Sequence, residues 1–415
     1  MQQPELLPHL FRTEYRKITA VLCKFFGIEH IEIAEDIASD TFLLASETWG
    51  IKGLPENPAA WLYTVAKNKA KDYLKRDNIF NKKIVTQLKN NSASTDEIEI
   101  DLSSKNIADS QLQMMFAICH PAIPAEAQIG LSLRILCGFG INEIAAAFLT
   151  NTTTINKRLF RAKEKLRAEK VKIEFPDESA INQRLKTVAT TLYLLFNEGY
   201  YSSGQDITLR KELCLEAMRL TYLLVEDEST DQPFINALLS LMCFQASRFE
   251  ARLNENGEII LYHQQDESTW DAALISQGEK FLNRAAKGDT LSKYHLEAGI
   301  AYWHTHKADT KEKWENILQL YNRLLQIEYS PIVALNRTYA LSISNGKEEA
   351  IIEAEKLNLS ENHLYHSLLG ELYTGIDNKK AISHLQNALS LARSATDKNF
   401  IANKIRLCEQ RKNNS

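Results

Sequence analysis

Apolar residues recur at intervals of three and four positions along most of this chain of 415 residues, which is the period of amphipathic α-helices. Residues 5–76 form the first such segment, and glycines and prolines separate its helices. Residues 79–109 differ, because they are rich in Asn, Ser, Lys and acidic side chains and hold too few apolar groups to form a core. The pattern therefore predicts a helical domain over 1–78 and a flexible linker over 79–109.

The helical period returns after the linker and continues to the end of the sequence. It predicts a second small helical domain over residues 110–172 and long amphipathic helices over 173–415. Within the last segment, small and large residues follow each other as in tetratricopeptide repeats, at His366, Leu369, Gly370, Tyr373, Ala381, Leu385 and Ala388. The predicted fold class is all-α, with two small helical domains joined by a flexible linker and followed by a tetratricopeptide-like helical-repeat domain.

Residues 141–167 carry the strongest local pattern. A short helix over 141–148 is followed by a turn at 149–151, and Thr152 is the expected N-cap of a second helix. One buried stripe is expected on that helix, formed by Ile155, Leu159, Ala162 and Leu166. Ala145 is small where the two helices would cross. This arrangement is typical of a helix-turn-helix.

The other faces of that second helix are polar and basic. Between residues 157 and 172 there are eight Lys or Arg against two Glu, so we expect DNA and not a neutral partner. The alternative is a solvated basic helix end, which the helix dipole favours. The predicted contact residues are Thr153, Thr154, Asn156, Lys157, Arg158, Arg161 and Lys165.

A second basic strip lies on residues 61–76, where polar and cationic side chains recur every three or four positions opposite an apolar face. Its members are Thr64, Lys67, Asn68, Lys71 and Lys75. Such a strip suits a DNA backbone, and Asn68 could hydrogen-bond a base. By contrast, residues 28–49 are acidic and hold no Lys or Arg, so DNA would repel them and a protein partner is expected.

Composition adds limits to this interpretation. The hydrophobic and charged contents, 44% and 25%, are those of a globular protein, and the net charge of -4 argues against a protein that is basic over its whole surface. The N-terminus lacks a signal peptide and no apolar run could span a bilayer, which predicts a cytoplasmic protein without a membrane partner. Six scattered cysteines without a CxxC pair predict neither a metal site nor disulfides, and we expect no cofactor.

The motifs occur in a familiar order. AEDIASDTF, then PENPAAWLYTVAKNKAKDYLKR, a polar linker and a helix-turn-helix ending in RLFRAKEKLR resemble the extracytoplasmic-function (ECF) sigma factors of bacterial RNA polymerase over residues 8–172. LYLLFNEGY, QDESTWD and SPIVALNRTYAL are similar to the subgroup that carries a long tetratricopeptide-like extension. Leu149 departs from many helix-turn-helix motifs, which place Gly in the turn.

The resemblance implies partners and roles. Core RNA polymerase and promoter DNA would be the partners, and the segment 1–78 would be sigma region 2 and 110–172 sigma region 4. The helix over 34–49 would bind the polymerase clamp through Glu35, Asp36, Asp40 and Phe42. The minus-10 element would contact Asn57, Trp61, Thr64, Lys67, Asn68, Lys71 and Lys75, and the minus-35 element would contact residues 153–161. The extension would dock within the same chain and control the sigma half.

Other functions fit these motifs less well. A helix-turn-helix repressor or activator is the main alternative, but it would not need the 55–76 block or the acidic helix. An enzyme is not expected, because no nucleophile, base and orienting group occur at a recognisable spacing, and no small-molecule substrate is indicated. Polar and aromatic residues of the extension could form a contact site or satisfy helix ends, namely Asn197, Glu198, Tyr200, Gln265 and Asp266.

Overall fold

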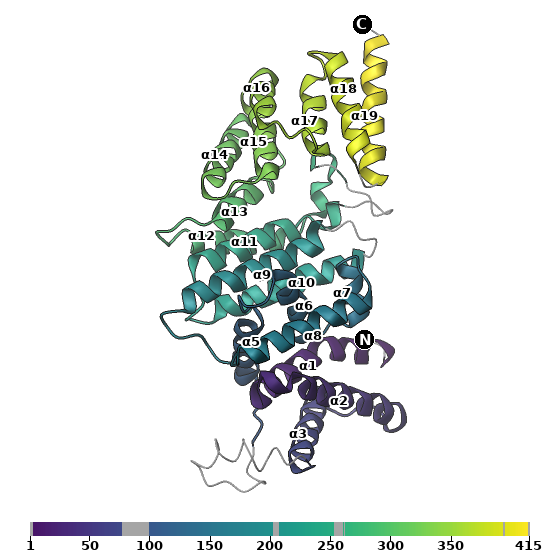
Figure 1. The fold of residues 1–415 in the computed structure, drawn as a ribbon, viewed down its shortest axis with the longest axis vertical. Coiled ribbons are helices and arrows are strands. Elements are labelled where there is room, and N and C mark those ends of the chain that lie inside the picture. The colour runs from purple at the N-terminus through teal and green to yellow at the C-terminus, as the bar shows by residue number, and fades with distance from the viewer. Residues whose placement is uncertain are drawn as a thin grey trace. The chain divides into compact units, whose positions relative to one another are not determined.

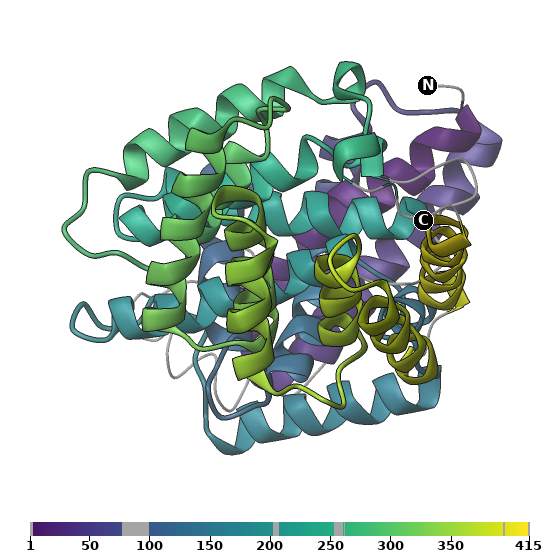
Figure 2. The same ribbon diagram turned by 90° about the horizontal axis from the view of Figure 1, so that it is seen from above.

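A computed structural model describes residues 3–76, 99–201, 207–252, 260, 262–392 and 395–413. All regular elements in these residues are helices, which confirms the predicted all-α class (Figures 1 and 2). None of the described helices is long and apolar enough to cross a membrane. The chain divides into two compact units, Met1–Asp231 and Gln232–Ser415, here called the N-terminal and the C-terminal unit.

The N-terminal unit begins with three helices, α1 (Gln3–Phe26), α2 (Ile31–Lys52) and α3 (Pro58–Arg76), and a single turn, η1 (Ile28–His30). Gly27 separates α1 from η1 with a φ of 85°, a left-handed conformation that glycine adopts without strain. Aromatic residues fill the space between α1 and α2, where the ring of Phe42 lies 5.0 Å from that of Phe11.

Five further helical elements make up the second group of this unit: α5 (Ser104–Ile118), α6 (Ala125–Leu131), the π turn η4 (Ser132–Leu136), α7 (Ile141–Ala147) and α8 (Thr152–Ala168). Helix α5 begins inside the expected linker, because Ser103 caps it by accepting from Asn106 N and Asp101 accepts from Ser103 N. This capping signal ends the linker earlier than Asp109. The rest of the expected linker, 79–98, lies outside the described residues.

Helices α7 and α8 lie where the sequence predicts a helix-turn-helix, and the expected stripe of Ile155, Leu159, Ala162 and Leu166 is buried. The N-cap of α8 is Asn151 and not Thr152, since the Asn151 side chain accepts from Thr154 N at 2.8 Å. Leu149 takes the left-handed conformation of the turn with a φ of 48°. A non-glycine residue is strained there by roughly 1–2 kcal/mol. The turn has the left-handed geometry despite this cost, although the sequence lacks Gly.

Two more helices complete the N-terminal unit, α9 (Ile181–Tyr201) and α10 (Ile207–Glu226). Thr191 of α9 donates to Gln128 Oε1 at 2.6 Å, and Arg219 of α10 donates to Leu136 O at 2.8 Å. The compact unit therefore ends at Asp231, whereas the sequence pattern predicted a domain boundary after residue 172. The difference arises because the buried face of α9 and α10 packs on α5, α6 and α7.

The C-terminal unit is a succession of packed helices: α11 (Pro233–Ala246), α12 (Ala272–Ala285), α13 (Lys293–Trp303), α14 (Lys311–Ile327), α15 (Pro331–Ser344), α16 (Lys347–Leu357), α17 (His363–Tyr373), α18 (Asn378–Leu391) and α19 (Ala395–Asn413). Three single turns, η5 (Glu250–Arg252), η6 (Tyr262–Gln264) and η7 (Glu267–Thr269), lie between α11 and α12. Small residues let helices approach: a Cβ on Gly370 would lie 2.6 Å from Leu385 Cγ. Helices that follow one another in the chain pack together, as α14 with α15 and α17 with α18.

Candidate nucleic-acid interface

The basic strip predicted on α3 lies on the surface. Leu62, Ala66, Ala70 and Leu74 are buried, whereas Thr64, Asn68 and Lys75 are exposed and Lys67 and Lys71 are half-buried. No carboxylate among the described residues forms an ion pair with Lys71 or Lys75. Since unpaired cations on one helical face attract a phosphate backbone, the strip is suited to nucleic acid.

Two other predicted contact residues of this region also shape the start of α3. The side chain of Asn57 accepts from Ala60 N at 3.0 Å and so caps the helix. The ring of Trp61 packs edge-on against that of Trp49 of α2 at 5.3 Å. Asn57 is exposed and Trp61 is half-buried, so the start of α3 carries a polar and an aromatic group.

The residues predicted to contact DNA on α8 are brought together on one side of that helix. Thr153, Thr154, Asn156, Lys157, Arg161 and Lys165 are exposed. Arg158 is half-buried, and its guanidinium lies 5.3 Å from the ring of Phe148. Lys165 pairs with Glu169 at 2.7 Å, but both side chains are about half exposed, so water and salt weaken that pair.

A groove of about 420 Å³ lies beside these residues. One wall is apolar and comes from Ala122, Ile123, Pro124 and Ala127. The other is cationic and comes from Lys157, Arg158, Arg161 and Lys165. A cationic wall of this kind suits a polyanion.

The four residues predicted to contact a protein partner lie on the acidic helix α2, where two of them are exposed and two are buried. Asp36 and Asp40 are exposed and line a groove of about 280 Å³ between α2 and α3, where Asp40 lies 3.6 Å from Lys69. Phe42 is 5% exposed and packs in the core, so its side chain does not form part of the surface. Glu35 is 7% exposed and has partners in the same unit.

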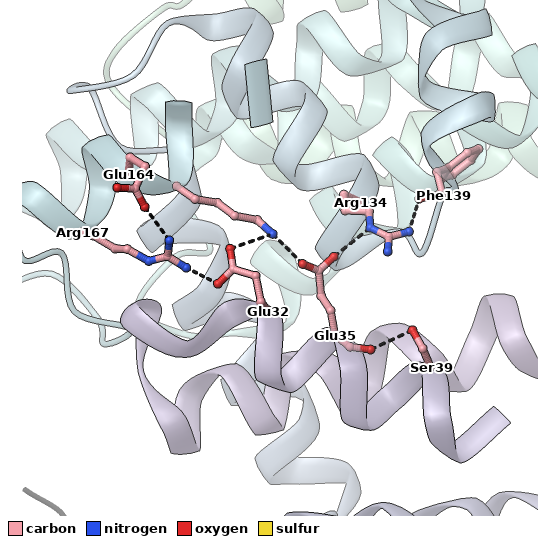
Figure 3. A network of polar contacts seen from close by, with 8 residues as sticks. Glu32, Glu35, Ser39, Arg134, Phe139, Glu164 and Arg167 are labelled. Carbon is pink, nitrogen blue, oxygen red and sulfur yellow. Dashed lines mark hydrogen bonds and ion pairs between the residues drawn. The ribbon is translucent and has the colours of Figure 1, made fainter. Parts of the chain in front are cut away.

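Those partners belong to the second group of helical elements, which runs from α5 to α8 (Figure 3). Glu35 accepts from Arg134 Nε of η4 at 2.7 Å and from Lys163 Nζ of α8 at 2.5 Å. One turn earlier, Glu32 lies 3.5 Å from Lys163 and also pairs with Arg167. We call Glu32, Glu35, Arg134, Lys163 and Arg167 the α2–α8 network. It joins the helix predicted to meet polymerase to the helix predicted to read DNA.

Charge and burial set the protonation of this network. Partial burial would raise the pKa of Glu32, but a backbone hydrogen bond and the cations of Lys163 and Arg167 outweigh it and lower that pKa below its usual value. Arg134 stays protonated, because Tyr15 and Glu35 offset the effect of its own burial and raise its pKa. Glu32 and Arg134 are therefore held in their charged forms by their neighbours.

Sequence reasoning did not single out Arg134 or Lys163. A signal for Lys163 was present, because it stands four residues after Leu159 and three before Leu166, on the buried stripe of α8. Glu35 likewise stands four residues after the buried Ile31. A charge on a buried stripe needs a partner, but its identity depends on the tertiary structure.

The residues of the possible contact site in the extension belong to two different units. Asn197, Glu198 and Tyr200 belong to α9 of the N-terminal unit, where Tyr200 is buried against Phe196 and burial raises the pKa of Glu198. Gln265 and Asp266 belong to the C-terminal unit, where Asp266 caps η7 by accepting from Ser268 N. Across the described ranges, no three His, Cys, Asp or Glu side chains are grouped so that they could hold a metal ion.

Comparison with known proteins gives two family matches and one relative. Residues 10–78 match the Sigma-70 region 2 family, and residues 184–286 match a Family of unknown function (DUF6596). Uncharacterized protein R00370 of Rhizobium meliloti (strain 1021) is 31% identical over 389 residues, which cover 92% of this chain and 90% of that protein. No solved structure matches the chain.

Proposed function

The chain belongs to the protein family that includes Uncharacterized protein R00370, and we propose that it is an ECF-type sigma factor. In this proposal it binds bacterial core RNA polymerase in the cytoplasm and directs promoter-specific transcription initiation, without enzymatic activity of its own. The observation that carries the proposal is the polar and cationic strip of α3, exposed or half-buried along its length, inside the Sigma-70 region 2 match and next to an acidic helix that DNA would repel.

Recognition of the minus-10 element is assigned to α3 and the connection before it. Thr64, Asn68 and Lys75 are exposed, and Asn68 carries both donor and acceptor groups that can meet a base edge. Lys67, Lys71 and Lys75 would pair with phosphates. Trp61 provides a ring on which an unstacked base could rest.

Recognition of the minus-35 element is assigned to α8. Its exposed Thr153, Thr154 and Asn156 lie in the first turns of the helix, which is the part of a recognition helix that enters the major groove. Lys157 and Arg161 follow on the cationic wall of the groove and would reach phosphates.

The polymerase contact is assigned to the exposed acidic residues of α2. Asp36 and Asp40 line a groove whose walls also carry Ile33 and Ile37 and the cations Lys69 and Arg76, a mixed lining that suits a partner segment with both apolar and charged groups. Glu35 would take part only when the α2–α8 network is open, because its carboxylate is engaged there.

Control by the fused extension is supported by α10, which belongs to the DUF6596 match. Glu216 of α10 pairs with Arg16 of α1 and with Arg219, which in turn donates to Leu136 O of η4. A single helix of the extension thus holds residues from both parts of the sigma half. We propose that this contact makes sigma activity depend on the extension.

Run-off transcription with bacterial core polymerase over a promoter library tests the proposal. We expect promoter-dependent transcripts that fall about fivefold or more with Asn68→Ala, which loses a base contact of about 1–3 kcal/mol, and that also fall with Arg161→Ala, which loses a phosphate contact. Lys311→Ala, an exposed cation of the C-terminal unit, is the matched control and should change nothing. DNA binding without any transcript would instead favour a helix-turn-helix repressor or activator.

A further inference from the structure

The C-terminal unit contains a cluster of polar and aromatic side chains around Tyr262 of η6. The ring of Tyr262 lies 5.0 Å from that of His304, which follows α13, and 6.2 Å from that of Trp270, which follows η7. Lys313 of α14 is 1% exposed, and its Nζ donates to the Tyr262 hydroxyl at 3.0 Å. Residues from α14 and from the ends of α13 and η7 therefore meet at one ring.

Arg248 brings a second cation to this cluster. It follows α11 and is 9% exposed, and its guanidinium lies 5.5 Å from the ring of Tyr262 and 6.0 Å from that of Trp270. Its Nε is buried without a hydrogen-bond partner, and no carboxylate of the described residues forms an ion pair with it. A buried charge normally has a partner that neutralises it or bonds to it. The guanidinium can therefore still bind an anion.

Three neighbouring side chains each hold a further hydrogen-bonding atom that is not used. Trp270 Nε1, His304 Nδ1 and Gln265 Oε1 are buried and have no partner within the described part of the chain. Gln265 is 5% exposed, and its amide nitrogen already donates to Ile260 O at 3.2 Å, which leaves its oxygen as an acceptor. Since an unpaired buried polar atom destabilises a fold, several in one cluster indicate a binding site.

The charges around Tyr262 favour an anionic ligand. Arg248 and Lys313 bring two positive charges, and Asp309 offsets one of them by accepting from Lys313 Nζ at 3.3 Å. Burial, with Arg248 and Lys313 nearby, lowers the pKa of His304 to about 3, so its ring is neutral at pH 7. One positive charge thus remains at Arg248. An oxyanion would neutralise it through charge-assisted hydrogen bonds.

We propose that this cluster binds a small oxyanion, the group that carboxylates and phosphates share. Arg248 Nε and Trp270 Nε1 donate to the oxyanion, and a hydroxyl of the ligand donates to Gln265 Oε1. All of these residues belong to the C-terminal unit, so the site does not rest on the proposed sigma function. Because the site joins residues from several elements, a bound ligand holds them together and stabilises the unit.

The test measures hydrogen exchange of the full-length protein with acetate, glycolate or inorganic phosphate, against chloride at equal ionic strength. A ligand of the folded unit slows amides that exchange only through unfolding of that unit, by one plus the ratio of its concentration to Kd. At about ten times Kd, the slowest amides of α13 and α14 should exchange about tenfold more slowly. Those of α1, in the N-terminal unit, should not change.

The three anions identify the chemistry of the ligand. Glycolate carries a hydroxyl that acetate lacks, so tighter binding of glycolate supports the contact with Gln265 Oε1. A response to phosphate alone assigns the site to phosphates, whereas a response to the two carboxylates alone assigns it to carboxylates. Anions that protect α13 and α14 no more than chloride does would overturn the proposal.

Two variants locate the response at the cluster. Arg248→Met keeps an unbranched side chain without the guanidinium, so it should abolish the protection by anions. Trp270→Phe keeps an aromatic ring without Nε1–H and should weaken binding about tenfold or more, because a hydrogen bond to a charged group is lost. Arg323→Met, at an exposed position of α14, is the matched control and should respond like wild type.

The second variant keeps the test decisive if the first one unfolds. Should Arg248→Met lose the folded C-terminal unit, Trp270→Phe alone decides, and a Kd equal to that of wild type would then refute the site. An undiminished response in both variants would mean that the anions bind elsewhere, which also contradicts the proposal. The sigma assignment is unaffected by these results, since run-off transcription measures it separately.

Discussion

Two helix contacts of this protein are built in opposite ways. Helices α2 and α8, in the N-terminal unit, meet through charged side chains that are partly or wholly buried. Helices α17 and α18, in the C-terminal unit, meet through Gly370, Ala381 and Leu385, with the two backbones close together. When the contact between α2 and α8 opens, its charged side chains exchange one polar partner for another. The second exposes apolar surface and leaves a void.

The difference separates a contact that can switch from one that holds a frame. Ion pairs can be replaced by the phosphates or charged groups of a partner at little net cost. No partner replaces the fit of Leu385 over Gly370, because a leucine side chain in water gains nothing in return. We therefore expect the α2–α8 network to open more readily than the contact between α17 and α18.

The largest expected effect concerns the apolar contact. Leu385 is 1% exposed, so Leu385→Ala should lower the free energy of unfolding of the C-terminal unit by about 3 kcal/mol, through lost burial and a new cavity. Hydrogen exchange of α17 and α18 amides measures it. Leu364→Ala, at a position 43% exposed in α17, should stay within about 0.5 kcal/mol. Similar losses in both variants would contradict the packing argument.

Acid should destabilise the C-terminal unit. Burial, with Arg248 and Lys313 nearby, lowers the pKa of His304 to about 3, whereas an unfolded histidine titrates near 6.5. The unfolded chain thus binds the proton first, and stability falls as pH drops below 6.5, by up to about 1.4 kcal/mol per pH unit. Urea unfolding of the C-terminal unit, followed by hydrogen exchange at pH 7, 6 and 5, measures this loss.

Matched measurements test the origin of that acid effect. His304→Gln should flatten the pH dependence, leaving the smaller part due to His295 and His384, whose pKa values are also lowered, chiefly by burial. The ion pairs of Glu32 should respond only at lower pH, because the pKa of Glu32 is lowered and its contribution is lost as pH falls through that value. Opening of the network at pH 6 would contradict this order.

The smallest expected effect is at the exposed edge of the network. Arg167→Met removes one partner of Glu32, whose side chain is 48% exposed and keeps Lys163, so the N-terminal unit should lose only about 0.5 kcal/mol. Urea unfolding at low and at high salt checks it, and the difference from wild type should vanish at high salt. A loss that salt leaves unchanged would mean that Arg167 acts through packing.

The sequence predicted the elements that depend on local periodicity. Helices α7 and α8, the buried stripe of α8 and the polar strip of α3 all follow from spacings of three and four residues, and the structure has them. Local capping was predicted less well, since Ser103 starts α5 inside the expected linker and Asn151 takes the place expected of Thr152. A cap depends on one side chain, so a shift of one residue is easily missed.

The surfaces were harder to predict than the elements. Phe42 and Glu35 were both assigned to a partner surface, but one is in the core and the other is paired inside the chain. A helix with acidic residues on several faces does not reveal which of them meet solvent. That choice depends on which helices pack on it, and the contact to Lys163 spans 128 positions of sequence.

The sequence by itself determined the class of the fold, the place of its helices and the two basic faces, because period and charge are properties of neighbouring residues. Only the tertiary structure decided that α9 and α10 complete the N-terminal unit and that Glu32 and Glu35 face α8. These pairings join residues far apart in the chain. They are fixed by the shapes and charges that remain after each helix has formed, which no local pattern contains.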